Sequence, residues 1–289
     1  MNDIFRLNST EPFQQISLES LSANQPGKTV LMIAHPGHEL RVYGWLSKVK
    51  PLVCVLTNGA GHTGKSRLDS TSRILASVGA TSGNIYGGYA DTEIYQAILA
   101  HDFSFFTDVV DDLVQLLIRQ EIEYIVGDAS EGYNPGHDIC RLLIDTAVEI
   151  VRQRTGNGVT NFDFLLTGNP AQIPHEVTQN TIQLILDTAT LQRKLEVSRS
   201  YAEMTSEVEL AIENFGEESF RTESFRLVKL SEFLTSGNQQ IPFYEQHGER
   251  QVTAGYYQHV IRYRQHMLPL IDALQQFVKG KALWMDCAS

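Results

Sequence analysis

Short apolar runs alternate with amphipathic stretches over the first 167 residues of the chain. Residues 29–34 and 52–57 are almost entirely apolar, as expected for strands buried on both faces of a sheet. Residues 103–119 instead place Phe106, Val110 and Leu113 at helical spacing on one face. Further strands are predicted at residues 84–86, 124–126 and 162–167, and further helices at residues 66–78 and 139–151. This alternation predicts an α/β fold, a Rossmann-like layered arrangement with a mostly parallel sheet.

The rest of the chain has a mostly helical pattern, at residues 177–200, 206–215 and 254–277, with a loop-like segment at residues 234–246. We therefore divide the chain into a polar lead-in (residues 1–27), a Rossmann-like domain (residues 28–233) and a helical C-terminal extension (residues 234–289). The last helix carries several aromatic and basic side chains, among them Tyr256, Tyr257, His259, Arg262 and Tyr263. It either packs with a polar face outward or lines a site.

The charge balance and the hydropathy pattern exclude several classes of function. The formal net charge is −11, and an anionic surface repels phosphate backbones, so we expect no nucleic-acid binding. No apolar run approaches the roughly 20 residues that span a bilayer, and the N-terminus lacks a secretory pattern, so we expect a cytoplasmic protein. Cys54, Cys140 and Cys287 have no ligand or disulfide spacing. The sequence leaves the oligomeric state open, a homo-oligomer included.

Two similar loops place histidines after predicted strands. His35-Pro36-Gly37-His38-Glu39 follows the first strand, and Asn134-Pro135-Gly136-His137-Asp138 follows the fourth. Sites in open α/β sheets form outside the carboxyl ends of the strands, so the two loops are expected at the same edge. Three protein ligands and an open water position are typical of catalytic zinc. The sequence therefore predicts a mononuclear site for Zn²⁺, or another divalent metal, built from His35, His38 and His137. The alternative is that these are loop histidines bonded to the backbone.

The motifs around these histidines resemble those of the PIG-L/LmbE-like de-N-acetylases, zinc enzymes that remove acetyl groups from N-acetylglucosamine conjugates. That family carries A-H-P-D-D-E after its first strand, and this chain has Ala34-His35-Pro36-Gly37-His38-Glu39. Weaker matches follow in order within residues 28–170: a glycine-rich turn at residues 57–61, a helix with Arg67 and Gly79, the segment at residues 88–91, and the loop at residues 132–137. The resemblance implies a sugar-like substrate, either a small molecule or a glycoconjugate, and an amide hydrolysis.

The chain departs from this family at the residues that move protons. By resemblance, His35, His38 and His137 fall on the three ligand positions, with a histidine where the family has aspartate. The family's base aspartate falls on Gly37, which cannot take a proton, and its second-loop histidine and aspartate fall on Asn134 and Gly136. The resemblance thus implies that the metal is kept while the acid–base groups are lost.

The catalytic residues are therefore unknown, and four carboxylates are candidates to replace the lost base: Glu39, Asp138, Glu131 and Asp128. Glu39 and Asp138 each follow a ligand, so either could instead orient that ligand. By resemblance, Arg67 and Asp91 match positions that bind substrate hydroxyls. We count Asn134 with them as a substrate-binding candidate.

These observations favour a metal-dependent hydrolase that deacetylates an N-acetylated sugar or sugar conjugate through a metal-bound water. Three neutral imidazoles leave the full charge on the ion, and three-histidine zinc can lower the pKa of its water to about 7. One alternative is a metal-binding module of the same fold without catalysis. Another is a nucleotide-binding protein, because residues 59–66 match the P-loop pattern G-x-x-x-x-G-K-[ST] between a predicted strand and a predicted helix.

Replacing Lys65 separates the P-loop alternative from the others. If the match is accidental, Lys65→Ala should change stability by no more than about 0.5 kcal/mol, as is usual for surface positions. Neither the wild type nor the variant should then bind ATP in a calorimetric titration. ATP binding that Lys65→Ala abolishes would contradict this interpretation.

Overall fold

The computed structural model describes residues 13–18, 21, 28–61, 64–172, 181–228 and 241–286. Within them, eight strands form one sheet in the order β1-β7-β8-β6-β5-β2-β3-β4. The strands are β1 (Phe13–Ser17), β2 (Thr29–Ile33), β3 (Leu52–Thr57), β4 (Thr81–Tyr89), β5 (Tyr124–Asp128), β6 (Thr160–Phe164), β7 (Thr181–Ile185) and β8 (Thr222–Leu227). Only β8 runs antiparallel to its neighbours β6 and β7. The sheet is therefore mostly parallel, which confirms the predicted fold class.

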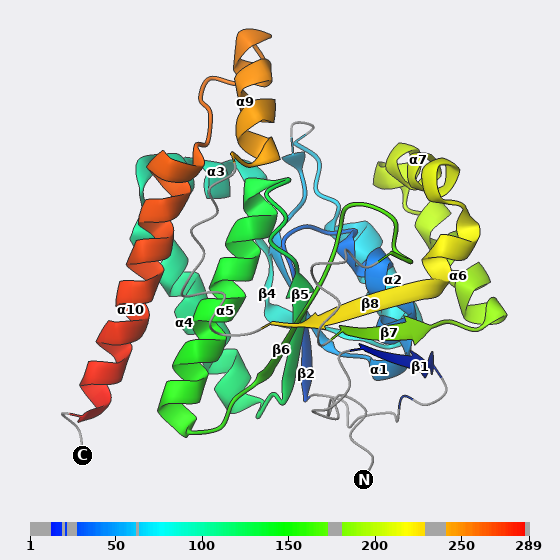
Figure 1. The fold of residues 1–289 in the computed structure, drawn as a ribbon, viewed down its shortest axis with the longest axis horizontal. Coiled ribbons are helices and arrows are strands. Elements are labelled where there is room, and N and C mark those ends of the chain that lie inside the picture. Colours follow the sequence, from blue (N-terminus) through cyan, green and yellow to red (C-terminus); the bar gives the residue numbers. More distant parts are fainter. Residues whose placement is uncertain are drawn as a thin grey trace.

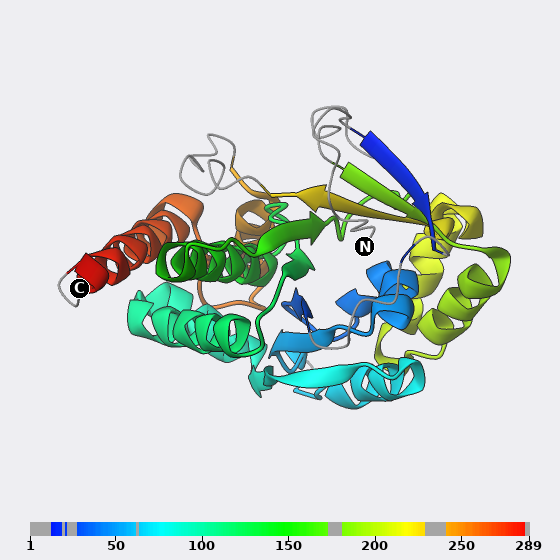
Figure 2. The same cartoon turned by 90° about the horizontal axis from the view of Figure 1, so that it is seen from below.

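Helices cover both faces of the sheet (Figures 1 and 2). They are α1 (Tyr43–Val49), α2 (Leu68–Val78), α3 (Asp91–Ala100), α4 (Phe103–Arg119), α5 (Pro135–Thr155), α6 (Thr188–Arg199), α7 (Thr205–Phe215), α9 (Phe243–Thr253) and α10 (Leu268–Asp286). No helix in the described ranges is long and apolar enough to cross a membrane.

Strand β2 is buried on both faces of the sheet. Val30 and Met32 pack into the core shared with α4, α5 and α10, whereas Leu31 and Ile33 pack into the core shared with α1 and α2. Successive side chains of a strand point to opposite faces, so a strand buried on both sides must be apolar throughout. This requirement explains the continuous apolar runs in the sequence.

Three expectations about the chain's outer parts are wrong. The lead-in contains β1, which pairs with β7 in parallel. Residues 181–185, expected within a helix, form β7, because pairing with β1 and β8 decides the conformation of an ambiguous apolar run. The last helix is α10, which begins at Leu268 rather than residue 254, and α9 begins within the expected loop, of which residues 234–240 lie outside the described residues.

The C-terminal extension shares the core of the main body. Helix α10 packs beside α4 and α5, as both views show (Figures 1 and 2). Its residues Leu270, Leu274 and Val278 recur at every fourth position and are buried in the same cluster as the α4 and α5 side chains. The extension therefore stabilises the body rather than forming a core of its own.

A buried ion pair holds the segment that follows His38. Lys194 Nζ on α6 lies 2.8 Å from Glu223 Oε1 on β8 and also donates to the Arg41 carbonyl at 2.9 Å. Glu223 in turn accepts hydrogen bonds from the first amides of α1, Gly44 N and Trp45 N, both at 2.8 Å. Burial lowers the pKa of Lys194, while the facing carboxylate opposes that shift. The pair thus joins α6, β8 and the start of α1 beneath the first histidine loop.

Removing one partner of this pair should cost far more than removing a surface pair. Lys194→Ala leaves Glu223 charged in the core, and we expect a loss of about 3–5 kcal/mol in the free energy of unfolding. Arg193→Ala removes the neighbouring, exposed pair with Glu196 and should lower the free energy of unfolding far less. Urea unfolding of both variants measures the difference, and equal losses would contradict the role given to the buried pair.

Candidate metal centre

The carboxyl ends of β2, β3 and β5 meet at one edge of the sheet and are bonded directly to one another. Thr57 N, at the end of β3, donates to the Ala34 carbonyl after β2 at 3.0 Å. Ala34 N donates to Asp128 Oδ2, at the end of β5, at 2.7 Å. The backbone just before His35 is therefore fixed from both sides.

His35 is oriented by a carboxylate from the next element along this edge. Its Nδ1 lies 2.9 Å from Asp91 Oδ1 on the first residue of α3 and 2.8 Å from Thr57 Oγ1. Burial raises the pKa of Asp91, but hydrogen bonds from His35, Thr57 and Gly61 outweigh it and hold that pKa well below its usual range. A carboxylate only accepts, so Nδ1 carries the proton and Nε2 keeps its lone pair.

His38 is oriented in the same way by Asp128. His38 Nδ1 lies 2.8 Å from Asp128 Oδ2, the oxygen that also accepts from Ala34 N. Asp128 is fully buried at the end of β5. Carboxylate–histidine pairs of this kind fix the tautomer and ring orientation of metal-binding histidines. Both His35 and His38 therefore use Nδ1 for the carboxylate and leave Nε2 for other partners.

His137 comes from the first turn of α5. Asn134 caps this helix by accepting from Gly136 N at 2.7 Å, and Pro135 occupies the first helical position, where its missing N–H costs nothing. Gly136 allows a close approach, because a Cβ there would lie 3.1 Å from His35 Nε2. Burial, followed by the nearby His38 and His35 rings, lowers the pKa of His137, so the ring is neutral.

The three imidazoles form one cluster, with ring centroids 4.6 to 5.3 Å apart. His35 Nε2, His137 Nδ1 and Asp128 Oδ1 are buried there without a hydrogen-bond partner in the described part of the chain. Each such atom costs about 1–3 kcal/mol, which a bound ligand can offset. No three histidine, cysteine, aspartate or glutamate side chains in that part are already arranged around one ion. The donor chemistry of the three neighbouring imidazoles fits a metal, and their side chains would have to shift to bind one ion together.

Two of the four candidate bases brace the loops instead of facing the histidines. Glu39 is fully buried and accepts from Gly37 N and Thr71 Oγ1, both at 2.7 Å. Burial raises its pKa against the effect of these bonds. Glu131 accepts from Leu166 N at 2.7 Å and from the Thr167 amide and hydroxyl. Neither carboxylate accepts a hydrogen bond from any of the three histidines.

The other two candidates are also engaged by the protein. Asp138 Oδ1 accepts from Glu131 N and Gly132 N at 3.1 Å, and burial raises the pKa of Asp138 to about 6. Asp128 orients His38. The expectation that Glu39 and Asp138 orient the ligands is therefore wrong. Asp128 and Asp91 do so. Asp128 ends β5, and Asp91 follows β4 as the first residue of α3, so their place at strand ends was a signal in the sequence.

Another residue occupies the space into which a side chain at position 37 would project. Its φ is +106°, a conformation that L side chains rarely adopt, and a Cβ would overlap Met204 Sδ. Tyr201 lies next to Met204 at this point. The position of the resembled family's base is thus occupied here by a thioether from the segment before α7.

The three substrate-binding candidates have different contacts in the structure. Asp91 has its oxygens bound by His35, Thr57 and Gly61, which gives it a positioning role toward His35. Asn134 uses its side-chain oxygen as the cap of α5 and accepts from Tyr95 Oη at 3.3 Å. Arg67 is half-buried before α2, and its carbonyl accepts from Tyr201 Oη at 3.2 Å. Of the three, only Asp91 contacts a histidine of the cluster.

The P-loop match does not have the geometry of a phosphate-binding loop. Helix α2 begins at Leu68, two residues after Ser66, with Arg67 as its N-cap. Ser66 Oγ donates to the Asn58 carbonyl at 3.3 Å and accepts from Leu68 N at 3.2 Å. In a P-loop the lysine and the following hydroxyl open the helix whose N-terminus faces the phosphates. Here they precede it, which argues against the nucleotide-binding alternative.

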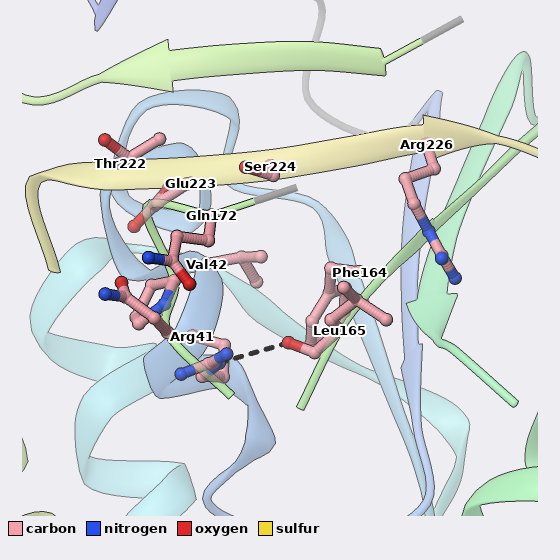
Figure 3. A pocket seen from close by; sticks show the side chains of 11 residues that line it. Arg41, Val42, Phe164, Leu165, Gln172, Thr222, Glu223, Ser224 and Arg226 are labelled. Atoms are coloured by element: carbon pink, nitrogen blue, oxygen red, sulfur yellow. Dashed lines mark hydrogen bonds between the residues drawn. The ribbon is translucent and has the colours of Figure 1, made fainter. Parts of the chain in front are cut away.

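Two cavities lie apart from the histidines. One, lined by Arg41, Gln172, Glu223 and Arg226 among others, is shown in Figure 3, where the Arg41 guanidinium points to the Leu165 carbonyl, 3.1 Å from Nε. Burial lowers the pKa of Arg41 to about 10. The other, about 200 Å³, lies between α5, the start of β6 and the end of β8. None of the three histidines lines either cavity.

No family model and no curated protein matches the chain. Among solved structures it is similar to Dbv21, the A40926 pseudoaglycone deacetylase, with 14% identity, a TM-score of 0.49 and coverage of 70% of this chain and 96% of that one. It is also similar to the Orf2*T deacetylase triple mutant of the teicoplanin pathway, with 16% identity, a TM-score of 0.46 and coverage of 70% of this chain and 98% of that one. The conserved protein TT1542 from Thermus thermophilus has 16% identity and a TM-score of 0.44, with coverage of 70% of this chain and 94% of that one. At such identities the likeness concerns the fold alone.

The strain at Gly37 can be measured with a matched glycine. Gly37→Ala should lower the free energy of unfolding by at least about 1–3 kcal/mol, because the positive φ and the overlap with Met204 both oppose a side chain. Gly158→Ala is the control, since a Cβ there meets open space. Urea unfolding compares the two. Equal stability would show that the loop accepts a side chain, and Gly37→Asp would then be a fair test of a restored base.

Proposed function

We propose that the chain is a metal-dependent amide hydrolase that removes the acetyl group from an N-acetylated sugar or sugar conjugate. The observation that carries the proposal is the pairing of His35 with Asp91 and of His38 with Asp128, beside the neutral His137. These histidines match the ligand positions of the resembled de-N-acetylases. Their spacing and their free ring nitrogens support a site for one divalent cation.

His35, His38 and His137 would hold the ion, with zinc as the first expectation. An ion held by three neutral imidazoles retains its full charge, and it would polarise an acyl carbonyl and acidify water. Asp91 and Asp128 would accept from Nδ1 of their partners and so leave each Nε2 to the ion. His137 is neutral because burial lowers its pKa, so its lone pair is available as well.

The chain's own acid–base groups set an upper limit on the rate. Glu39, Glu131, Asp128 and Asp138 all accept hydrogen bonds from the protein, and Met204 fills the space beside Gly37. General acid–base help contributes about 10²–10⁴-fold. We therefore propose a hydrolase that is slow for its fold, with catalysis left to the ion and to positioning.

A second candidate is a metal-binding module without catalysis. The specific observation that favours it is the side chain of Met204, which occupies the place where a base at residue 37 would project. A site adapted to bind a ligand without turnover needs no base there. The two candidates share the metal site and differ only in whether an amide is cleaved.

Metal content tests the part that both candidates share. The purified protein should hold about one divalent ion per chain, and His137→Ala should lose most of it. Asp128→Asn should weaken metal affinity about 10–100-fold, because the amide no longer fixes His38. His259→Ala, which replaces an exposed histidine far along the chain, should bind metal like the wild type. Full metal content in His137→Ala would remove that residue from the ligand set.

Hydrolysis separates the two candidates. N-acetylglucosamine, its methyl glycoside and N,N′-diacetylchitobiose are incubated with metal-loaded protein, and the released amine and acetate are measured. The proposed hydrolase should release both in equal amounts, His137→Ala should release neither, and His259→Ala should match the wild type. A metal-loaded wild type that cleaves none of a broad N-acetyl sugar panel would leave the binding module as the function.

A further inference from the structure

A line of exposed aromatic rings leads away from His137. The Tyr133 ring lies 6.5 Å from the His137 ring and stacks on Phe243, with centroids 5.1 Å apart and planes within 2°. Phe243 is followed by His247 at 5.8 Å, and His247 by Tyr257 at 6.4 Å. We name these four residues, Tyr133, Phe243, His247 and Tyr257, the aromatic ledge. Tyr133, Phe243 and Tyr257 are 50%, 44% and 48% exposed, respectively.

The ledge is held in place by contacts underneath it. Tyr244 N donates to the Gly132 carbonyl at 3.1 Å, and the Tyr244 side chain is buried in the main core. Gly248 packs against Val260, and Glu245 accepts from Tyr263 N at 2.9 Å. Helix α9 itself stands away from the sheet, above the other elements in Figure 1. The body thus anchors one side of α9 and leaves the aromatic side open.

The chemistry of the ledge favours one kind of occupant. Aromatic faces carry partial negative charge and attract the weakly positive C–H groups of a ring that is apolar on its faces. Polar groups lie beside these rings: His247, the tyrosine hydroxyls, and Arg250, whose guanidinium lies 5.6 Å above Phe243. Half-exposed aromatic rings with hydrogen-bonding groups beside them suit a pyranose, which is apolar on its faces and polar at its rim. The net charge of −11 disfavours an anionic membrane surface.

We infer that the aromatic ledge is a subsite for a second sugar ring of the substrate, beyond the ring whose N-acyl group reaches the histidines. The order of the rings supports this assignment, because Tyr133 is next to His137 and the others follow outward. Neighbouring exposed aromatic rings that form one patch are a common mark of a binding site, unlike exposed apolar side chains scattered singly. The inference rests on the proposed function for its substrate class but does not require cleavage.

Binding to the metal-free and metal-loaded protein tests the ledge apart from catalysis. N-acetylglucosamine, N,N′-diacetylchitobiose and cellobiose, which has two rings and no acyl group, are titrated by saturation-transfer NMR and calorimetry. We expect N,N′-diacetylchitobiose to bind about five- to tenfold more tightly than N-acetylglucosamine. Phe243→Ala and Tyr133→Ala should remove this preference and abolish cellobiose binding. Tyr256→Ala is the matched control, because Tyr256 is 78% exposed and lies outside the ledge.

Each outcome assigns the failure to one proposal. If nothing is hydrolysed but the two-ring preference is present and is lost in Phe243→Ala, the ledge stands and the hydrolase does not. If both sugars are hydrolysed and bound equally by the wild type and Phe243→Ala, the hydrolase stands and the ledge does not. The ledge could instead bind a second copy of the chain, and sedimentation of the same samples tests this. A dimer that Phe243→Ala converts to a monomer, with no preference for two-ring sugars, would also overturn the inference.

Discussion

The carboxylate of Asp128 connects the sheet to the site. One of its oxygens accepts from Ala34 N and from His38 Nδ1, so the end of β5 fixes both the backbone that leaves β2 and the ring that follows it. A fully buried carboxylate is stable only when such donors surround it. The position of the first histidine loop therefore depends on two strands that are far apart in the sequence and adjacent in the sheet.

The other acidic residues near the histidines show how the same residue type serves different tasks. Asp91 faces an imidazole, whereas Glu39 and Asp138 accept from backbone amides of the two histidine loops and Glu131 accepts from amides of the segment after β6. These donors hold each carboxylate in place, so the three side chains stiffen the segments around the histidines. None of the three accepts a hydrogen bond from an imidazole, and the orienting contacts to His35 and His38 come from Asp91 and Asp128.

The C-terminal part of the chain connects the body to this site. Helix α10 completes the core against α4 and α5, and the segment before it returns along α9 to the loop that holds Tyr133. The C-terminal part therefore contacts both the core and the loop beside the histidines. Loss of its packing would affect the stability of the body and the position of that loop together. This arrangement explains why aromatic residues of α9 lie beside a helix N-terminus more than 100 residues earlier in the sequence.

The sequence alone determined the alternation of strands and helices, the parallel core and the three histidines, because periodic burial and strand-end position are local properties. Short, continuous apolar runs that alternate with amphipathic stretches favour strands buried on both faces, and Pro-Gly-His loops after them are expected at the sheet edge. The tertiary structure decided what depends on distant partners. It made residues 181–185 a strand through pairing with β1 and β8, and it gave the orienting role to Asp91 and Asp128 rather than to Glu39 and Asp138. It also filled the space beside Gly37 with Met204, a contact across more than 160 residues that no local pattern specifies.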